Sequence, residues 1–451
     1  MSLNKKKLLV IFPIFLTSMF GCKKLIEVGT PPNQLTTSTV FSDSSTATAA
    51  LLNGYAQFDK AIDPNYTPFI GIYAGELSYT AGNIGTLEFL HGAISASNST
   101  VQAIWQNMYA AIYQCNDLIG NLKVSSGVTH SASAQLIGEA KFLRAYAYFY
   151  LTNSFGPVPL VLTTDTKSNS LLSNADSASI YRQIVGDLQE AIVALPETYI
   201  GDGKVRANKW AATALLARVH LYQRDWADAG DLAGTVINSG NYTPLDSAQN
   251  VFLAGSTESI LQFWTQYGYT SEGLSFIPDG SVPNYPISSY LLDAFETGDL
   301  RLLYWTDSVS FGKTTYYYPF KYHNRSPNST NVEYLMGLRL SEQYLIRAEA
   351  RAYQNDIPGA IADINTLRFR AGLPQTSAVD QSSVLDAIAH ERQTELFLEW
   401  GHRFLDLKRM GMLDEYMLQI RPDWKVGISV LLPIPQSEIS YDPKLKQNPG
   451  Y

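Results

Sequence analysis

The amino-acid sequence predicts a mainly α-helical fold of paired helices, interrupted by one long, irregular insertion rich in aromatic residues. Apolar residues recur at helical spacing in many windows along the chain, and one helix-turn-helix segment occurs twice. No part of the sequence shows the sustained alternation and hairpin turns that are typical of an all-β sandwich. With 451 residues, 45% of them apolar, the chain is long enough to bury a large core.

The first 21 residues have the pattern of an export signal. Lys5–Lys7 precede the apolar run Leu8–Phe20, which is too short for a permanent span because a membrane helix needs about 20 apolar residues. Met19–Cys22 follows and resembles a bacterial lipobox, with a small residue directly before the first cysteine. An ordinary secretory signal is the alternative, but we expect acylation of Cys22 and stable anchoring to a membrane.

The rest of the chain divides into four segments by composition. Residues 22–40 are polar and contain Pro31-Pro32, which predicts a tether. Residues 41–240 form a predicted N-terminal helical region, and residues 336–451 form a predicted C-terminal helical region. Between them, residues 241–335 are rich in Tyr, Trp, Gly and Pro and are expected to be irregular.

The clearest predicted helices have an apolar residue every three or four positions and lie on both sides of the insertion. Ser179 and Ser341 are plausible N-caps for two of them. The windows are Val101–Leu122, Ala134–Asn153, Ser179–Leu195, Asn208–Gln223, Trp226–Asn238, Ser341–Gln354, Ile357–Arg370 and Ser383–Trp400.

One internal repeat is visible by eye. Tyr222–Ala229 (YQRDWADA) matches Tyr353–Ala360 (YQNDIPGA), with Tyr, Gln, Asp and Ala at the same places. Each copy lies between two amphipathic windows, which predicts a helix, a tight turn at the Asp, and a second helix whose Ala allows close packing. This is the unit of tetratricopeptide-like helical hairpins, although the two copies are not contiguous.

The charge and cysteine content exclude several classes of protein. The net charge of −8, with no basic run after the first residues, argues against nucleic acid as a partner. Cys22 and Cys115 are the two cysteines, so neither a disulfide framework nor a Cys-rich zinc site is available. The six histidines form no metal-spaced pair, and we expect no resident metal and no cofactor.

The most tempting catalytic pattern is the stripe Glu391, Glu395 and Glu399, which could supply the acid and base of a glycoside hydrolase. Such a pair must flank a sugar from two sides, whereas side chains four residues apart on one helix are neighbours. We therefore expect these carboxylates to form ion pairs with arginines and the protein to be no enzyme. The expected partners are Arg392, Arg403, Arg368 and Arg370.

Aromatic residues in loops are the best candidates for ligand contact. Sugars present apolar faces and a rim of hydroxyls, which exposed rings and nearby polar groups bind. Two regions fit, Tyr66–Trp105 and Trp264–Tyr322. If Tyr267 and Tyr269 lie on an extended segment around Gly268, both rings point to one side and Trp264 points to the other, inward. The candidate ligand-binding residues are Tyr73, Tyr79, Trp264, Tyr267, Tyr269 and Trp305.

Six segments, in order along the chain, resemble the SusD/RagB family of outer-membrane lipoproteins from Bacteroidetes. The resemblance implies a helical, tetratricopeptide-like (SusD-like) scaffold. It also implies a lipoprotein, on the outer face of the outer membrane, that captures oligosaccharides (in some members peptides) for a SusC-like TonB-dependent transporter. Lys23-Lys24 stand where acidic residues often accompany surface display. The segments are residues 31–43, 139–161, 208–226, 339–374, 391–411 and 431–451.

Three functions remain open at this point. The leading one is a non-catalytic, glycan-binding lipoprotein that delivers its ligand to a transporter. The second is a glycosidase on a helical scaffold. The third is an interaction module whose helical repeats bind only protein and whose aromatic residues are buried.

Overall fold

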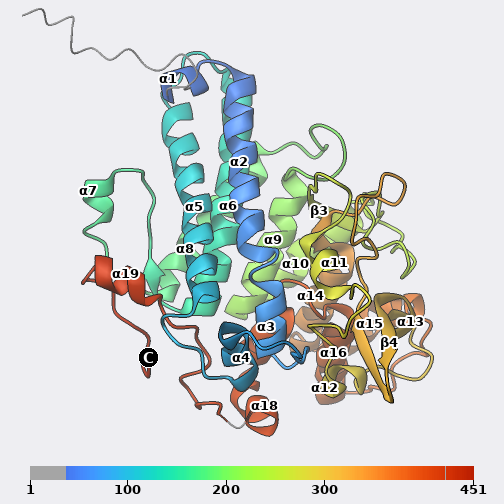
Figure 1. The fold of residues 1–451 in the computed structure, drawn as a ribbon. Coiled ribbons are helices and arrows are strands. Elements are labelled where there is room, and N and C mark those ends of the chain that lie inside the picture. Colours follow the sequence, from blue (N-terminus) through green and yellow to red (C-terminus); the bar gives the residue numbers. More distant parts are fainter. Residues whose placement is uncertain (1–36, 422) are drawn as a thin grey trace, which may run out of the picture.

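A computed structural model describes residues 37–421 and 423–451 (Figure 1). The predicted signal segment, Cys22 and the tether up to residue 36 lie outside the described residues. The short helix α1, Thr37–Val40, ends the predicted tether. Within the described ranges, no helix is long and apolar enough to cross a membrane.

Four long helices of the N-terminal region pack side by side (Figure 1). They are α2 (Ser44–Ile62), α5 (Ser99–Leu122), α6 (His130–Phe155) and α8 (Ser177–Ala194). The last three confirm predicted windows, whereas α2 was not predicted. Asp43 begins α2, since its carboxylate accepts hydrogen bonds from the backbone N–H groups of Ser45 and Thr46.

The repeated segment forms two helical hairpins, as predicted. The first joins α9 (Lys209–Gln223) to α10 (Trp226–Asn238), and the second joins α14 (Leu340–Tyr353) to α15 (Ile357–Arg370). In both turns the residue before the Asp has a left-handed backbone, with φ of 61° at Arg224 and 65° at Asn355. Helices α10 and α14 pack together, so the two copies are neighbours in space despite the insertion between them.

The insertion contains short elements and two small antiparallel sheets. Strand β3 pairs with β6, which begins at the last residue of the insertion and continues into the C-terminal region, and β4 pairs with β5 in a projecting hairpin. The elements are β3 (Ser259–Phe263), α11 (Ser271–Phe276), α12 (Ser289–Leu292), α13 (Leu300–Trp305), β4 (Thr306–Phe311), β5 (Thr314–Pro319) and β6 (Leu335–Arg339).

The last predicted helix ends earlier than expected, at Glu395, because Leu398 and Trp400 have left-handed backbones with φ of 50° and 53°. Shorter elements complete the described chain, together with this helix, α16 (Gln381–Glu395). These elements are α3 (Thr67–Tyr73), α4 (Ile84–His91), β1 (Val158–Pro159), α7 (Thr166–Asn169), β2 (Asn174–Ala175), α16 (Gln381–Glu395), α17 (His402–Arg409), α18 (Leu413–Ile420) and α19 (Gln436–Tyr441).

The two predicted serine caps were wrong. Asp176 caps α8, and Ser179 lies one turn inside the helix, where its backbone N–H donates to that carboxylate. Ser341 is the second residue of α14, and its hydroxyl donates to the buried Glu258. The competing partner was local for Ser179, where Asp176 precedes it by three residues, and distant for Ser341, whose partner Glu258 belongs to another segment.

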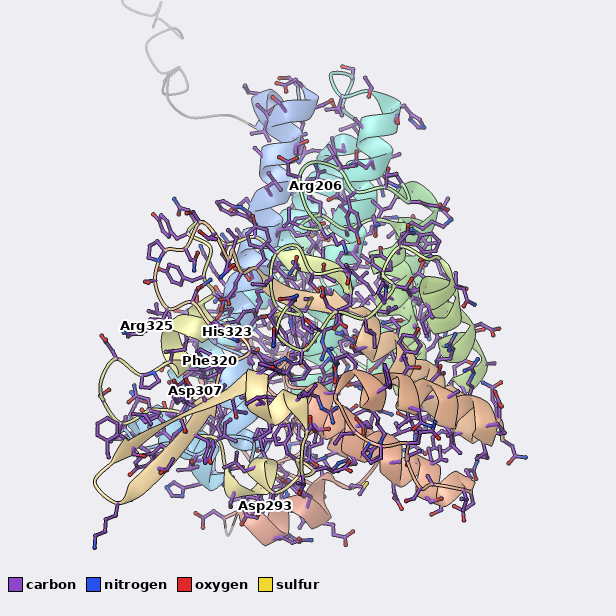
Figure 2. The ribbon with its side chains drawn as sticks, turned by 90° about the vertical axis from the view of Figure 1, so that its right-hand side faces the viewer. Arg206, Asp293, Asp307, Phe320, His323 and Arg325 are labelled. Carbon is purple, nitrogen blue, oxygen red and sulfur yellow. The ribbon has the colours of Figure 1, made fainter. Side chains whose placement is uncertain are left out.

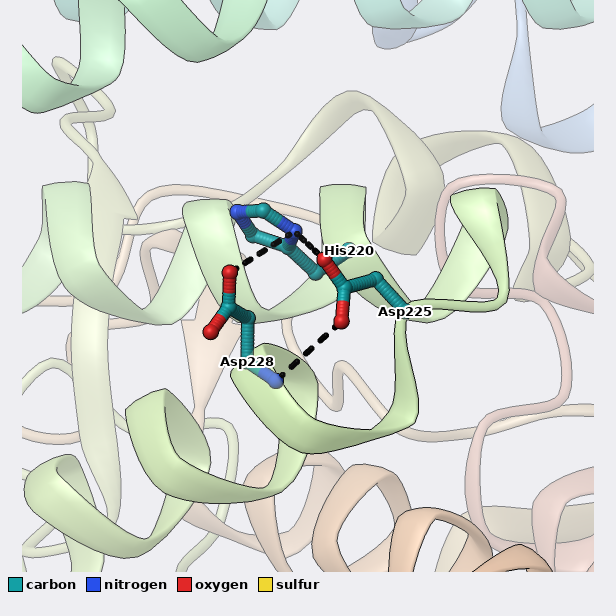
Figure 3. A group of neighbouring side chains, drawn as sticks. All are labelled: His220, Asp225 and Asp228. Atoms are coloured by element: carbon teal, nitrogen blue, oxygen red, sulfur yellow. Dashed lines mark hydrogen bonds and ion pairs between the residues drawn. The ribbon is translucent and has the colours of Figure 1, made fainter.

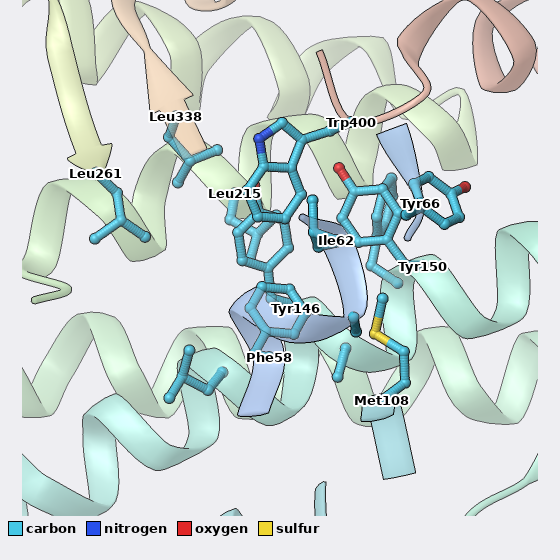
Figure 4. Packing of buried hydrophobic residues seen from close by; sticks show 14 of the residues in the cluster. Phe58, Ile62, Tyr66, Met108, Tyr146, Tyr150, Leu215, Leu261, Leu338 and Trp400 are labelled. Carbon is cyan, nitrogen blue, oxygen red and sulfur yellow. The ribbon is translucent and has the colours of Figure 1, made fainter. Parts of the chain in front are cut away.

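One hydrophobic core joins the N-terminal helices, the insertion and the C-terminal region (Figure 4). The indole of Trp400 stacks on Tyr146 with ring centroids 5.2 Å apart and packs against Phe58 and Phe263. The Trp400 ring N–H donates to the carbonyl of Met336. This shared core holds the end of α2 against β3, which positions the site described next.

Candidate functional site: an aromatic pocket with a carboxyl floor

A pocket of about 870 Å³ lies between the C-terminal half of α2, the loop 200–206 and the segment after β3. Its wall is aromatic, and its floor and rim carry carboxyl groups. The lining residues are Leu52, Tyr55, Ala56, Asp59, Asp63, Ile200, Gly201, Asp202, Val205, Arg206, Phe263, Trp264, Thr265, Gln266, Tyr267, Tyr269 and Ser271.

Three of the predicted ligand-binding residues lie together in the pocket wall. Trp264 is 58% exposed and Tyr267 is 54% exposed, so both rings are open to solvent. The rings of Tyr267 and Tyr269 are 6.3 Å apart with an interplanar angle of 17°, so the expectation that they share a side is confirmed. The expected inward position of Trp264 was wrong. Strand β3 ends at Phe263 and the chain turns at Gln266-Tyr267, so strand alternation does not continue through this segment.

Gly268 holds the two tyrosines in place through a contact within the protein. Its φ of 73° is left-handed, and a Cβ there would lie 2.2 Å from the carbonyl oxygen of Asn328. Its own carbonyl accepts from the backbone N–H of Glu333 and the side-chain amide of Asn324. The space left by the missing side chain of Gly268 is therefore filled by another loop of the chain.

The pocket floor contains two carboxyl groups from the end of α2. Asp63 is 7% exposed; its Oδ2 accepts from the backbone N–H of Ser271 at 2.9 Å, and its Oδ1 has no hydrogen-bond partner in the protein. The Oδ1 atom of Asp59 is also without a partner. Burial, followed by repulsion from Asp63, raises the pKa of Asp59 to about 8. Burial likewise raises the pKa of Asp63 to about 7.

Arg206, labelled in Figure 2, also lines the pocket, but its charge is already paired. The Arg206 Nε and Nη2 groups donate to both carboxylate oxygens of Glu139, at 3.1 and 2.6 Å. The hydroxyl of Tyr55 donates to the same carboxylate and accepts from the backbone N–H of Ala207. The loop 200–206 is held on β3 by a backbone hydrogen bond from Gln262 to Lys204.

The other three candidates lie outside this pocket. Tyr73 is fully buried, and its hydroxyl donates to the carbonyl of Ser429. Trp305 is 1% exposed, and its ring N–H donates to the carbonyl of Ala248. Placing these two rings on an exposed platform was wrong, because tertiary packing covers both. Tyr79 is half-buried against Tyr285, with ring centroids 5.5 Å apart.

The glutamate stripe forms a buried ionic network, as expected. Glu391 pairs with Arg368 and Arg301, and Glu395 pairs with Arg370, Arg339 and Arg301. Glu399 pairs with Arg339 and Lys321. Arg368 and Arg370 were predicted partners, whereas the expected Arg392 pairs with Asp406 instead. Despite burial, Arg370, Arg339 and Arg301 hold the pKa of Glu395 well below its ordinary value. Arg339 and Lys321 likewise lower the pKa of Glu399.

His220, Asp225 and Asp228 form a second cluster of potential ligand atoms, at the turn of the first hairpin (Figure 3). The Nδ1 atom of His220 lies 3.2 Å from Asp225 and 3.8 Å from Asp228. Asp225 is the N-cap of α10. In the second repeat, Arg351 stands at the position of His220 and lies 3.5 Å from the capping Asp356. The contact is therefore a feature of the repeated turn, in which a basic side chain (His220 or Arg351) lies beside the carboxylate of the N-cap residue.

The sequence interpretation missed the floor of the pocket. Asp59 and Asp63 attracted no attention because α2 itself was not predicted. A signal was available: Ala47, Leu51, Phe58 and Ile62 lie at helical spacing, and Asp43 is a good N-cap. Nothing local, however, could indicate that this helix end would meet a loop about 200 residues later.

Comparisons with known proteins fit this architecture. A family model described as "SusD family" matches residues 264–451, and a second, described as "Starch-binding associating with outer membrane", matches residues 30–221. The chain belongs to the SusD/RagB family. The resemblance read from its six segments is thereby confirmed.

Curated relatives in the SusD family align over most of the chain. A SusD-like protein P2 of Formosa agariphila is 25% identical over 99% of this chain and 100% of its own length. The starch-binding protein SusD of Bacteroides thetaiotaomicron is 26% identical over 73% of this chain and 75% of its own length.

Solved structures of SusD proteins share the fold. A laminarin-binding SusD-like protein superposes with a TM-score of 0.79 at 27% identity, covering 91% of this chain and all of that one. A SusD superfamily protein from Bacteroides vulgatus gives the same TM-score at 20% identity. The predicted mainly helical fold is thus confirmed by both the elements and the neighbours.

Proposed function

We propose that this protein is a non-catalytic carbohydrate-binding protein and that the pocket between α2 and the segment 263–271 is its binding site. The observation that carries the proposal is the combination of three exposed or half-exposed rings with unpartnered carboxyl oxygens in one pocket. Rings bind the apolar faces of sugars, and carboxyl oxygens accept hydrogen bonds from hydroxyls. The starch- and laminarin-binding relatives support the same class of ligand.

The arrangement favours binding over hydrolysis. Asp59 and Asp63 are four residues apart at the end of one helix, so both carboxyls approach a ligand from the same side. The acid and base of a glycosidase must flank the scissile bond. The other carboxylates considered for catalysis, Glu391, Glu395 and Glu399, are buried in ion pairs.

The finer proposal concerns location and delivery. The predicted export signal and Cys22 support a lipid anchor, and the family resemblance supports a place on the outer face of the outer membrane. The family resemblance supports a SusC-like TonB-dependent transporter as the partner that receives the oligosaccharide. Co-purification of such a transporter with the wild-type protein from detergent-solubilised outer membranes tests this partnership, and its absence would contradict it.

The binding test uses laminari-, malto- and cello-hexaose and a mixed tripeptide library, measured by calorimetry and followed by chromatography of the recovered ligand. We expect heat with at least one oligosaccharide and no shorter products. Trp264→Ala should weaken that binding, whereas Tyr441→Ala, which removes a ring that is 86% exposed outside the pocket, should not. Product formation would establish a glycosidase, and no heat with any ligand would favour a protein-only interaction module.

A further inference from the structure

The carboxyl groups of the pocket have no free cation among the described lining residues to pair with. Asp59 and Asp63 lie in the floor and Asp202 lies in the exposed rim. Among the described residues that line the pocket, Arg206 is the single cationic side chain, and Glu139 neutralises it through two hydrogen bonds. A ligand entering this pocket therefore meets carboxyl groups and no available positive charge.

The carboxyl oxygens in the floor lack donors. Asp63 is more than nine-tenths buried, it lines the pocket, and one of its oxygens has no partner; Asp59 has one such oxygen as well. Buried polar atoms without hydrogen bonds are unfavourable, and a ligand that brings donors relieves that penalty. Sugar hydroxyls and amines are donors, whereas carboxylate and sulfate groups can only accept.

We propose that the pocket selects saccharides by charge, admitting neutral and amine-bearing sugars and excluding sugars that carry carboxylate or sulfate groups. This inference rests on the proposed function and adds the class of substrate to it. Its physical basis is that like charges placed against each other across an interface repel, and a cost of only about 1.4 kcal/mol already weakens binding tenfold.

The charged surroundings of the two carboxyls make the exclusion depend on pH. The charges that face these carboxyls include Glu272 on α11, which interacts electrostatically with Asp63 and also with Lys321 and Glu399. The pocket also contains the Arg206–Glu139 ion pair and the exposed carboxyl of Asp202. Because burial raises the pKa of Asp59 to about 8 and that of Asp63 to about 7, both groups gain charge between pH 6 and pH 9. Exclusion of anionic sugars should strengthen over that range.

The test compares three forms of one glucan backbone: the neutral hexaose, its C6-carboxylate and its C6-amine. The three forms are made for laminari-, malto- and cello-hexaose, so that the test does not depend on which glycosidic linkage the pocket prefers. For the backbone that binds, we expect the carboxylate form to bind at least about tenfold more weakly than the neutral form at pH 9, and the difference to shrink at pH 6. The amine form should bind at least as tightly as the neutral form at pH 7.

The double variant Asp59→Asn with Asp63→Asn keeps the shape of the floor and removes its charge. It should bring the carboxylate and neutral forms close to equal affinity. Asp293→Asn is the matched control, because this exposed aspartate does not line the pocket and is far from Arg206 in Figure 2. If the double variant does not fold, the pH series on the wild-type protein remains a complete test.

Two results would count against different claims. Equal binding of the neutral and carboxylate forms by the wild-type protein at pH 9 would overturn charge selection and leave carbohydrate binding intact. Failure of every backbone in every charge form would overturn the proposed function, and the inference with it.

Discussion

The rings of Tyr267 and Tyr269 lie nearly parallel, 6.3 Å apart, on one wall of the pocket. The intervening Gly268 makes this possible, because its left-handed backbone packs against residues 328–333 with no room for a side chain. Two nearly parallel rings in the pocket wall offer apolar faces against which a sugar ring can pack. One side of this loop packs against residues 328–333, and the other side exposes the ring of Tyr267 to solvent.

Removing both rings should weaken ligand binding and leave the fold intact. The variant Tyr267→Ala with Tyr269→Ala should reduce the binding free energy of the best oligosaccharide by about 1–3 kcal/mol, the scale of anchoring side chains at a binding hot spot. Calorimetry measures the loss, and thermal melting checks the fold. Tyr290→Ala, which removes another exposed tyrosine outside the pocket, is the control. Unchanged affinity in the double variant would place the binding surface elsewhere.

The alanines of the repeated turn should be intolerant of large side chains. Ala229 and Ala360 are fully buried, the former against Ile346 and Ala350 of the neighbouring hairpin. Ala229→Trp and Ala360→Trp should each lower the free energy of unfolding by about 1–3 kcal/mol through overpacking. Ala227→Trp, at an exposed position of the same turn, should have little effect. Urea unfolding compares the three, and equal stability of all three would contradict the hairpin packing.

Glu395 should be essential to the stability of the C-terminal region. It is fully buried and pairs with Arg301, Arg339 and Arg370, so its removal leaves buried positive charges unbalanced. Glu395→Ala should lower the free energy of unfolding by about 3–5 kcal/mol. The exposed pair of Glu197 with Lys209 offers a contrast, since Glu197→Ala should cost less than about 1 kcal/mol. Similar losses for the two variants would argue against this network.

Asp59 should make stability depend on pH. Its pKa is raised from 3.8 to about 8 in the folded protein, chiefly by burial, so the folded state binds the proton more tightly than the unfolded state does. Its contribution to stability is present below about pH 3.8 and is lost as the pH rises towards 8. Asp59→Asn should therefore gain stability relative to the wild type between pH 5 and pH 9. Denaturant unfolding at pH 5, 7 and 9 measures the difference, and a constant difference would contradict the assignment.

Cys22 should carry the lipid anchor. Cys22→Ser should yield a protein that is soluble and takes up no radiolabelled fatty acid in cells, while the wild type is labelled and sediments with membranes. Cys115→Ser is the matched control, because Cys115 is a buried residue of α5. Label retained by the Cys22 variant would rule out this attachment point.

Local periodicity was sufficient to predict most of the helical scaffold. The predicted bounds of α10 and α15 coincide with the observed ones, since apolar spacing, an Asp cap and a turn residue all act within a few positions. The repeat of Tyr222–Ala229 follows from the same short-range logic, whereas the partners of the glutamate stripe come from positions at least 23 residues away. Charge and residue type, too, are properties that the chain carries before it folds.

The pocket depended on contacts between distant segments, which no local pattern contains. Asp63 at the end of α2 meets Ser271 through a hydrogen bond that spans about 200 residues, and Trp264 faces the pocket because β3 ends where its pairing with β6 ends. Tyr73 and Trp305 were plausible binding residues until packing covered them. Burial is decided by what the rest of the chain places on top of a residue, so the aromatic residues could be named from the sequence, but only the three-dimensional fold separated the binding wall from the core.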